Sequence, residues 1–171
     1  MEMSTSFALK RQGLAGWGVS VLLVSGVAGG GLPARRLAAL GARVMVQESL
    51  DRALDRLLGD WSDGPRAIGL LVIDCDHAGG GVAGQQAFDL LARAGLRLPV
   101  MLICSACPEQ TFPVGRVAPY RLRAPVSAVA LRIAFELAFA DQFGCAGQGP
   151  SGSAPDAPEK GRSRGGAPFR I

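Results

Sequence analysis

Short runs rich in apolar residues recur along the middle of the chain, each separated from the next by a polar or amphipathic segment. Runs of about four to eight residues rich in Val, Ile and Leu are typical of strands buried on both faces. We predict five strands on this basis. They cover residues 19–25, 43–47, 68–74, 98–104 and 120–123.

The segments between these runs carry helical patterns. We predict helices over 34–40, 50–58, 85–94 and 127–142. Ser49 can cap the second of them, and Ser127 starts the last. On the last helix we expect one face to bury against the sheet, formed by Val129, Ile133, Leu137 and Ala140. The proline-punctuated stretch from Pro108 to Pro119 is expected to hold no more than a short, poor helix.

Strands that alternate with helices predict an α/β fold. Because the strands are continuous apolar runs and crossovers are right-handed, we predict a doubly wound five-stranded parallel sheet with helices on both faces, of the receiver or flavodoxin type. Ligands of such sheets bind at the carboxyl ends of the strands. Polar or chemically versatile residues stand there at Ser25, Glu48, Asp74 to His77, Cys104 to Cys107 and Arg123.

Composition limits the classes of function. The chain has 171 residues, of which 49% are hydrophobic and 19% charged, so it can bury a core. A net charge of +4 and an aromatic content of 6% argue against an obligate nucleic-acid binder. Four cysteines are too few for a secreted disulfide scaffold, which favours a reducing, cytoplasmic location.

The two ends of the chain differ from its middle. We predict a flexible leader over 1–18, one domain over 19–143, and a disordered tail over 144–171 that is rich in Gly, Pro, Ser and Arg. The apolar stretch near the N-terminus is rich in glycine, which destabilises a helix. We therefore expect no membrane span and no secretion signal.

Three stretches of the chain resemble a known family. Leu70-Leu-Val-Ile-Asp-Cys75, Gly84-Gln-Gln-Ala-Phe-Asp-Leu-Leu91 and Leu98-Pro-Val-Met-Leu-Ile-Cys-Ser105 resemble the response-regulator receiver domain of chemotaxis type. In receivers a hydrophobic strand ends in the phospho-accepting Asp, and a Leu-Pro-Val strand ends in Thr or Ser. Asp74 precedes Cys104 by 30 positions, which is the usual interval of the family. The resemblance covers about residues 19–143.

The resemblance implies roles for several residues. Asp74 matches the phospho-acceptor, and Asp76 is a competing match because it is better spaced from Gly84. Either carboxylate could instead be a plain solvated loop residue. Cys104 stands in the place of the switch Thr or Ser, with Ser105 beside it, and Arg123 stands in the place of the Lys of the last strand.

The departures from the family weaken the case for phosphorylation. Receivers resemble one another in an acidic pair that holds Mg²⁺ after the first strand, and here those places read Ser25 and Gly26. Magnesium requires oxygen ligands, carboxylates above all, so it would bind only if the lost pair were compensated. The resemblance therefore implies a stand-alone pseudo-receiver in signal transduction, which is not an enzyme and in which a phosphorelay is doubtful.

Such a domain acts by protein contact, and its partner would be a histidine kinase, a downstream regulator or a second copy of the chain. We expect the contact at the face made by 108–119, 120–123 and 127–142. Its candidate residues are Tyr120 and an aromatic stripe at helical spacing, formed by Phe135, Phe139 and Phe143. The alternative is that this stripe belongs to a wide core face.

Two other interpretations remain. Gly26 to Gly31 and Glu48 resemble the first unit of a short-chain dehydrogenase, which would bind a dinucleotide. The Tyr-x-x-x-Lys of that family is absent, because Ala124 stands four residues after Tyr120, in the place of the Lys. A thiol or metal sensor is the other. Cys104 and Cys107 form a CxxC, and Cys75 and His77 follow the neighbouring strand, so zinc or redox chemistry is conceivable.

Overall fold

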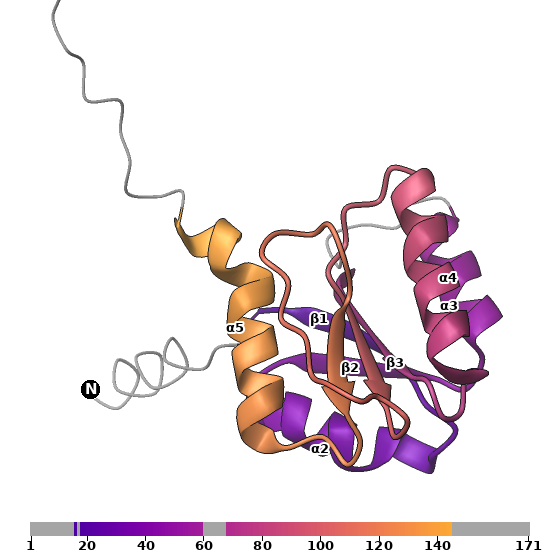
Figure 1. Cartoon of the computed structure of the whole chain (residues 1–171), viewed down its shortest axis with the longest axis horizontal. Helices are drawn as coiled ribbons and strands as arrows, with labels where there is room; N and C mark the ends of the chain where they lie inside the picture. Colours follow the sequence, from indigo (N-terminus) through magenta and orange to yellow (C-terminus); the bar gives the residue numbers. More distant parts are fainter. Residues whose placement is uncertain (1–15, 17, 60–67, 145–171) are drawn as a thin grey trace, which may run out of the picture.

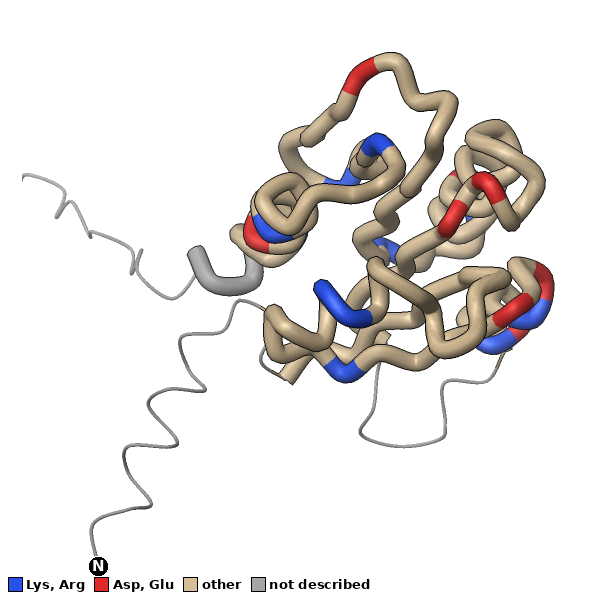
Figure 2. Tube along the Cα trace, turned by 90° about the horizontal axis from the view of Figure 1, so that it is seen from below, with Lys and Arg blue, Asp and Glu red and all other residues tan. Residues whose placement is uncertain are grey.

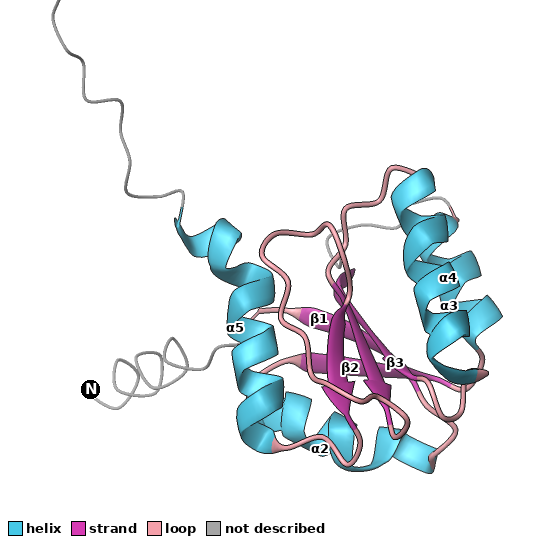
Figure 3. Ribbon diagram, in the orientation of Figure 1, coloured by secondary structure: helices cyan, strands magenta, loops and turns pink. Residues whose placement is uncertain are grey.

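The computed structural model describes residues 16, 18–59 and 68–144. Its single sheet has five strands in the order β2-β1-β3-β4-β5, and every neighbouring pair is parallel. The strands are β1 (Ser20–Val24), β2 (Arg43–Gln47), β3 (Ile68–Asp74), β4 (Val100–Cys104) and β5 (Tyr120–Arg123), coloured magenta in Figure 3. This confirms the predicted doubly wound parallel sheet.

Helices cover both faces of the sheet (Figure 1). The α2 helix (Gly31–Ala39), preceded by the short 3-10 turn η1 (Ala28–Gly30), and the α5 helix (Ala128–Gly144) lie on one face. The α3 helix (Leu50–Leu58) and the α4 helix (Gly80–Arg93) lie side by side on the other. Among the described residues, no helix is long and apolar enough to cross a membrane.

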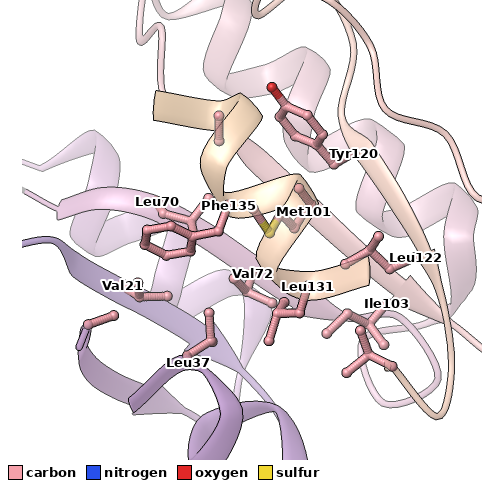
Figure 4. Packing of buried hydrophobic residues seen from close by; sticks show 14 of the residues in the cluster. Val21, Leu37, Leu70, Val72, Met101, Ile103, Tyr120, Leu122, Leu131 and Phe135 are labelled. Carbon is pink, nitrogen blue, oxygen red and sulfur yellow. The ribbon is translucent and has the colours of Figure 1, made fainter. Parts of the chain in front are cut away.

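The alternation of side chains along each strand divides the core in two. On β3, Leu70 and Val72 pack under α2 and α5, whereas Leu71 and Ile73 pack under α3 and α4. Figure 4 shows the first of these clusters, in which Leu131 and Phe135 of α5 lie over the strands. Because both faces of the central strands are buried, those strands are apolar at nearly every position, with Ser20 and Asp74 as polar ends of β1 and β3.

The start of α4 differs from the prediction. The helix begins at Gly80 rather than Gln85, so the glycines predicted as a loop form its first turns. Gly79 has a φ of +95° at its N-cap, which favours glycine. Gly84 is inside the helix and buried. A Cβ there would lie only 2.8 Å from Leu102 Cδ2 and 3.1 Å from Cys75 Sγ. This glycine therefore allows α4 to pack closely on the sheet.

The predicted inner face of α5 is wrong. Val129, Ile133 and Leu137 are exposed by 68%, 42% and 42%, whereas Phe135 and Phe139 are buried. Both stripes have helical spacing, so the pattern alone could not separate them. The larger phenylalanines fill the space over the sheet together with Ala134 and Ala138, and this leaves the aliphatic stripe facing solvent.

The same finding corrects the predicted interface residues. Phe135, Phe139 and Tyr120 are 0%, 2% and 2% exposed, so they belong to the core and are not available to a partner. The side chain of Phe143 lies outside the described residues. The stretch from Pro108 to Pro119 contains no helix, and its Thr111 pairs with Arg121 in an isolated antiparallel bridge beside β5. The predicted leader over 1–18 and tail over 144–171 also lie outside the described residues, except for Gly16, Gly18 and the backbone of Gly144.

Candidate functional site

The carboxyl ends of β1, β3 and β4 meet at one edge of the sheet, as the parallel pairing requires. A pocket of about 290 Å³ opens there between α2 and the end of β5. Its polar lining includes Ser25, Asp74 and Asp76, and its apolar lining comes mainly from the start of α2 and from Ile103 and Val126. Asp74 follows Leu70 and Val72 in the alternation of β3, so it lies on the α2 and α5 side of the sheet.

The Asp76 carboxylate is hydrogen-bonded to Ser105, the residue that follows β4. The Ser105 amide donates to both carboxylate oxygens of Asp76 at 3.1 Å, and the Ser105 hydroxyl donates to Oδ1 at 2.9 Å. The two residues come from neighbouring strand ends separated by 29 positions in the chain. The structure thus brings together Asp76 and Ser105, the less favoured acid and the neighbour of the predicted switch residue.

Ser25 serves the loop that follows β1. It is 1% exposed, and its hydroxyl accepts a hydrogen bond from the Val27 amide at 3.2 Å. Its own amide donates to Gln47 O at the end of β2. The side chain that stands in place of a metal-binding carboxylate therefore holds the turn into η1.

His77 lies where a side chain at position 26 would be. A Cβ on Gly26 would lie 2.2 Å from His77 Nδ1, so only glycine leaves room for the ring. The other ring nitrogen, Nε2, is 2.8 Å from Glu48 O and hydrogen-bonds it. The imidazole joins the loops after β1, β2 and β3. No local pattern in the sequence indicates this contact, because Gly26 and His77 are far apart in the chain.

These contacts test whether the site suits the magnesium ion implied by the resemblance. Magnesium requires several oxygen ligands in near-octahedral geometry. Ser25 Oγ holds a backbone amide, the place beside Gly26 is filled by an imidazole, and Asp76 is bonded to Ser105. In the part of the chain that the structure describes, no group of three or more His, Cys, Asp or Glu residues is arranged to hold a metal ion. The residues present do not fit Mg²⁺.

Arg123 and Cys104 lie apart from the Asp74 pocket. Tyr120 and Leu122 point into the α2 and α5 cluster, so Arg121 and Arg123 leave β5 on the opposite face from Asp74. Arg121 there donates to Gln85 Oε1 of α4 at 2.8 Å. The residues that line the pocket beyond β5 are Ala124 and Pro125. Cys104 packs in the α3 and α4 cluster, on the same face as Arg121.

Three cysteines gather in that second cluster. Cys75, Cys104 and Cys107 are all buried and unpaired by disulfides, and Cys104 and Cys107 line a small cavity of about 100 Å³. Burial raises the pKa of the Cys75 thiol, as does its hydrogen bond with Cys104, and burial is also the main cause that raises the pKa of Cys104. His77, the fourth zinc ligand considered from the sequence, is hydrogen-bonded instead to Glu48 O.

We expect Cys75 and Cys104 to react slowly with alkylating reagents at neutral pH. Since the thiolate is the reactive form and both pKa values are raised, alkylation of the native chain should be at least about tenfold slower than in urea. The raised pKa values also mean that the unfolded state loses these protons first as pH rises. The contribution of these two thiols to the free energy of unfolding is therefore fully present below the ordinary thiol pKa of about 8.5. It is lost progressively as the pH rises above that value.

The measurement is mass mapping of each alkylated cysteine after timed exposure at several pH values. Free energies of unfolding measured between neutral and alkaline pH check the second part. Equal alkylation of Cys75 in the native chain and in urea would contradict the burial of this thiol.

Comparison with solved structures decides between the candidate folds. The receiver domain of Francisella response regulator 1452 matches with a TM-score of 0.55 and 15% identity, over 72% of this chain and 98% of that one. A response regulator receiver domain protein from Clostridium thermocellum matches with a TM-score of 0.54 and 15% identity, over 74% of this chain and 98% of that one. The chain has the fold of a response-regulator receiver domain.

The receiver fold does not favour the dinucleotide-binding alternative. Both receiver domains are covered almost completely by the match, and the strand order of the chain is that of the flavodoxin-like sheets. No protein-family model matches the chain, and no curated protein sequence matches it either. At this low identity, what the receiver-like domain does has to be argued from its own residues.

Proposed function

We propose that this chain is a pseudo-receiver: a receiver-like domain that acts in signal transduction by binding a protein partner, without a working phosphorelay and without enzymatic activity. The fold supports the general class of domain. The contact between His77 and Gly26 carries the finer proposal, because an imidazole takes the space that a carboxylate at position 26 would need. The proposal places the domain in the cytoplasm, with a histidine kinase or a downstream regulator as its partner.

Phosphoryl transfer depends on neutralising the charge of the transferred group and on positioning it. Beside Asp74, Ser25 and Gly26 stand in place of the acidic pair, Asp76 is hydrogen-bonded to Ser105, and Arg123 leaves from the other face of the sheet. Asp74 would therefore gain little rate as a nucleophile.

A homodimer also falls within the proposal. The exposed apolar groups of α5 that could form it are Val129, Ile133 and Leu137, whereas Phe135 and Phe139 are buried.

The test is incubation of the full chain with a small phosphodonor and Mg²⁺, followed by intact mass measurement. We expect no stable phosphoryl adduct, and the same result for Asp74→Ala and Asp76→Ala. Magnesium-dependent labelling that disappears in Asp74→Ala would overturn the pseudo-receiver and restore an active response regulator.

A second pair of variants tests the contact that carries the proposal. Gly26→Asp should destabilise the chain, because the new side chain collides with His77. Adding His77→Ala should recover most of the lost stability by vacating the space. If Gly26→Asp were as stable alone as it is with His77→Ala, the ring would not be what excludes a carboxylate.

A further inference from the structure

A groove runs between α3 and α4, away from the pocket that contains Asp74. The two helices lie side by side on one face of the sheet (Figure 1), and the space between them measures about 500 Å³. Leu50 and Leu54 line it from α3, and Ala83, Ala87 and Leu90 line it from α4. Leu90 is 38% exposed, so an apolar surface is open to solvent there.

One end of this groove is acidic. Glu48 and Asp51 line it, both are exposed, and no Lys or Arg is among its described lining residues. Figure 2 shows acidic and basic positions close together on the side of the molecule where α3 and α4 lie, so the acidic character of this end comes from which of them line the groove. The whole chain nevertheless has a net charge of +4. The groove is thus an apolar surface with a local charge opposite to that of the chain.

His77 closes the same end. It lines the groove, its Nε2 is bonded to Glu48 O, and its ring lies against Gly26. The turn that contains it is fixed by bonds from the His77 and Ala78 amides to Asp74 O. The backbone at the acidic end of the groove is therefore anchored, through Glu48 O and His77, to the turn that follows β3.

We propose that this groove binds a basic amphipathic helix of a partner protein. Apolar residues spaced at i and i+4 on that helix contact Leu54 and Leu90, and a Lys or Arg at one end pairs with Glu48 and Asp51. A groove of this size holds only a few side chains, so the contact is a weak, transient one. The inference rests on the proposed function, since it names the surface and the chemistry of the partner.

The experiment uses a fluorescent model helix of Leu and Lys with leucines at i and i+4, and a matched peptide in which Glu replaces each Lys. Anisotropy titrations with the full chain should show saturable binding of the basic peptide, at least about tenfold tighter than that of the acidic peptide. Raising the salt concentration should weaken it, because exposed charges are screened.

Variants of α3 and α4 locate the site. Asp51→Lys and Leu90→Arg should each weaken binding of the basic peptide about tenfold. Asp55→Lys and Val82→Arg are matched controls on the same two helices, at exposed positions outside the groove lining, and should change the affinity less than about twofold. Circular dichroism of every variant confirms that it is folded.

Equal binding of both peptides, or equal losses in Asp51→Lys and Asp55→Lys, would overturn the groove as a site for basic helices. A synthetic peptide of residues 145–171 or a second copy of the chain that binds more tightly at the same residues would also overturn it, in favour of that occupant. These outcomes are independent of the phosphodonor experiment. A chain labelled at Asp74 would refute the pseudo-receiver and leave the peptide result to be judged by itself.

Discussion

Phe139→Arg is expected to unfold the domain. The ring is 2% exposed and packs against Phe135 with centroids 4.9 Å apart, within the cluster that joins α5 to the sheet. Truncating a buried Phe to Ala destabilises by about 3–5 kcal/mol, and a buried unpaired guanidinium adds a large desolvation penalty. Domains of this size are stable by only about 5–15 kcal/mol. Thermal unfolding followed by circular dichroism should show no cooperative transition at room temperature or above.

Leu137→Arg is the matched control, two positions away on the same helix. Leu137 is 42% exposed on the solvent face of α5, so the variant should melt within a few degrees of the natural chain. A folded Phe139→Arg that had merely lost self-association would contradict the core assignment and revive the aromatic interface predicted from the sequence. Loss of self-association in Leu137→Arg alone would point to the aliphatic stripe.

Gly30→Ala should destabilise the chain strongly, by about 2–5 kcal/mol. The backbone of Gly30 has a φ of +75°, and an L-residue in that region costs roughly 1–2 kcal/mol. The added Cβ would also lie 2.7 Å from Leu23 Cδ2 and 2.8 Å from Ala34 Cβ, in the core between β1 and α2. Such overpacking typically costs a further ~1–3 kcal/mol.

The neighbouring glycine separates these two contributions. Gly29 has a φ of +67° but nothing within 4 Å of its added Cβ, so Gly29→Ala should show only the backbone cost of roughly 1–2 kcal/mol. Chemical denaturation of both variants measures the difference. Equal losses would mean that the core relaxes around the new methyl group and that close packing of α2 on β1 does not require glycine.

Gly30 also connects stability to the candidate site. It lines the pocket that contains Asp74 and Asp76, and it precedes the first turn of α2. The glycine-rich loop that resembled a dinucleotide-binding turn is thus explained by packing. It brings α2 close to β1, and a φ above zero occurs at Gly29, Gly30 and Gly31.

The arrangement of the sheet could be predicted without the structure. Five strands, their parallel arrangement and helices on both faces followed from the spacing of apolar runs, because central strands buried on both faces are nearly continuous apolar runs. The helix cap at Ser49 could also be predicted, since capping is local: Ser49 Oγ accepts from the Arg52 amide. Ser127, predicted to start the last helix, accepts in the same way from the Ala130 amide.

The buried face of α5 and the side chains that meet at the carboxyl edge could not be predicted in this way, because both depend on contacts in three dimensions. Two stripes on α5 share one period, and the choice between them depended on the volume to be filled above the sheet. Arg123 matched a functional lysine by position, yet the alternation of β5 turned it away from Asp74. The contact of His77 with Gly26 and the bonds of Asp76 with Ser105 join segments far apart in the chain, and such contacts leave no periodic signal.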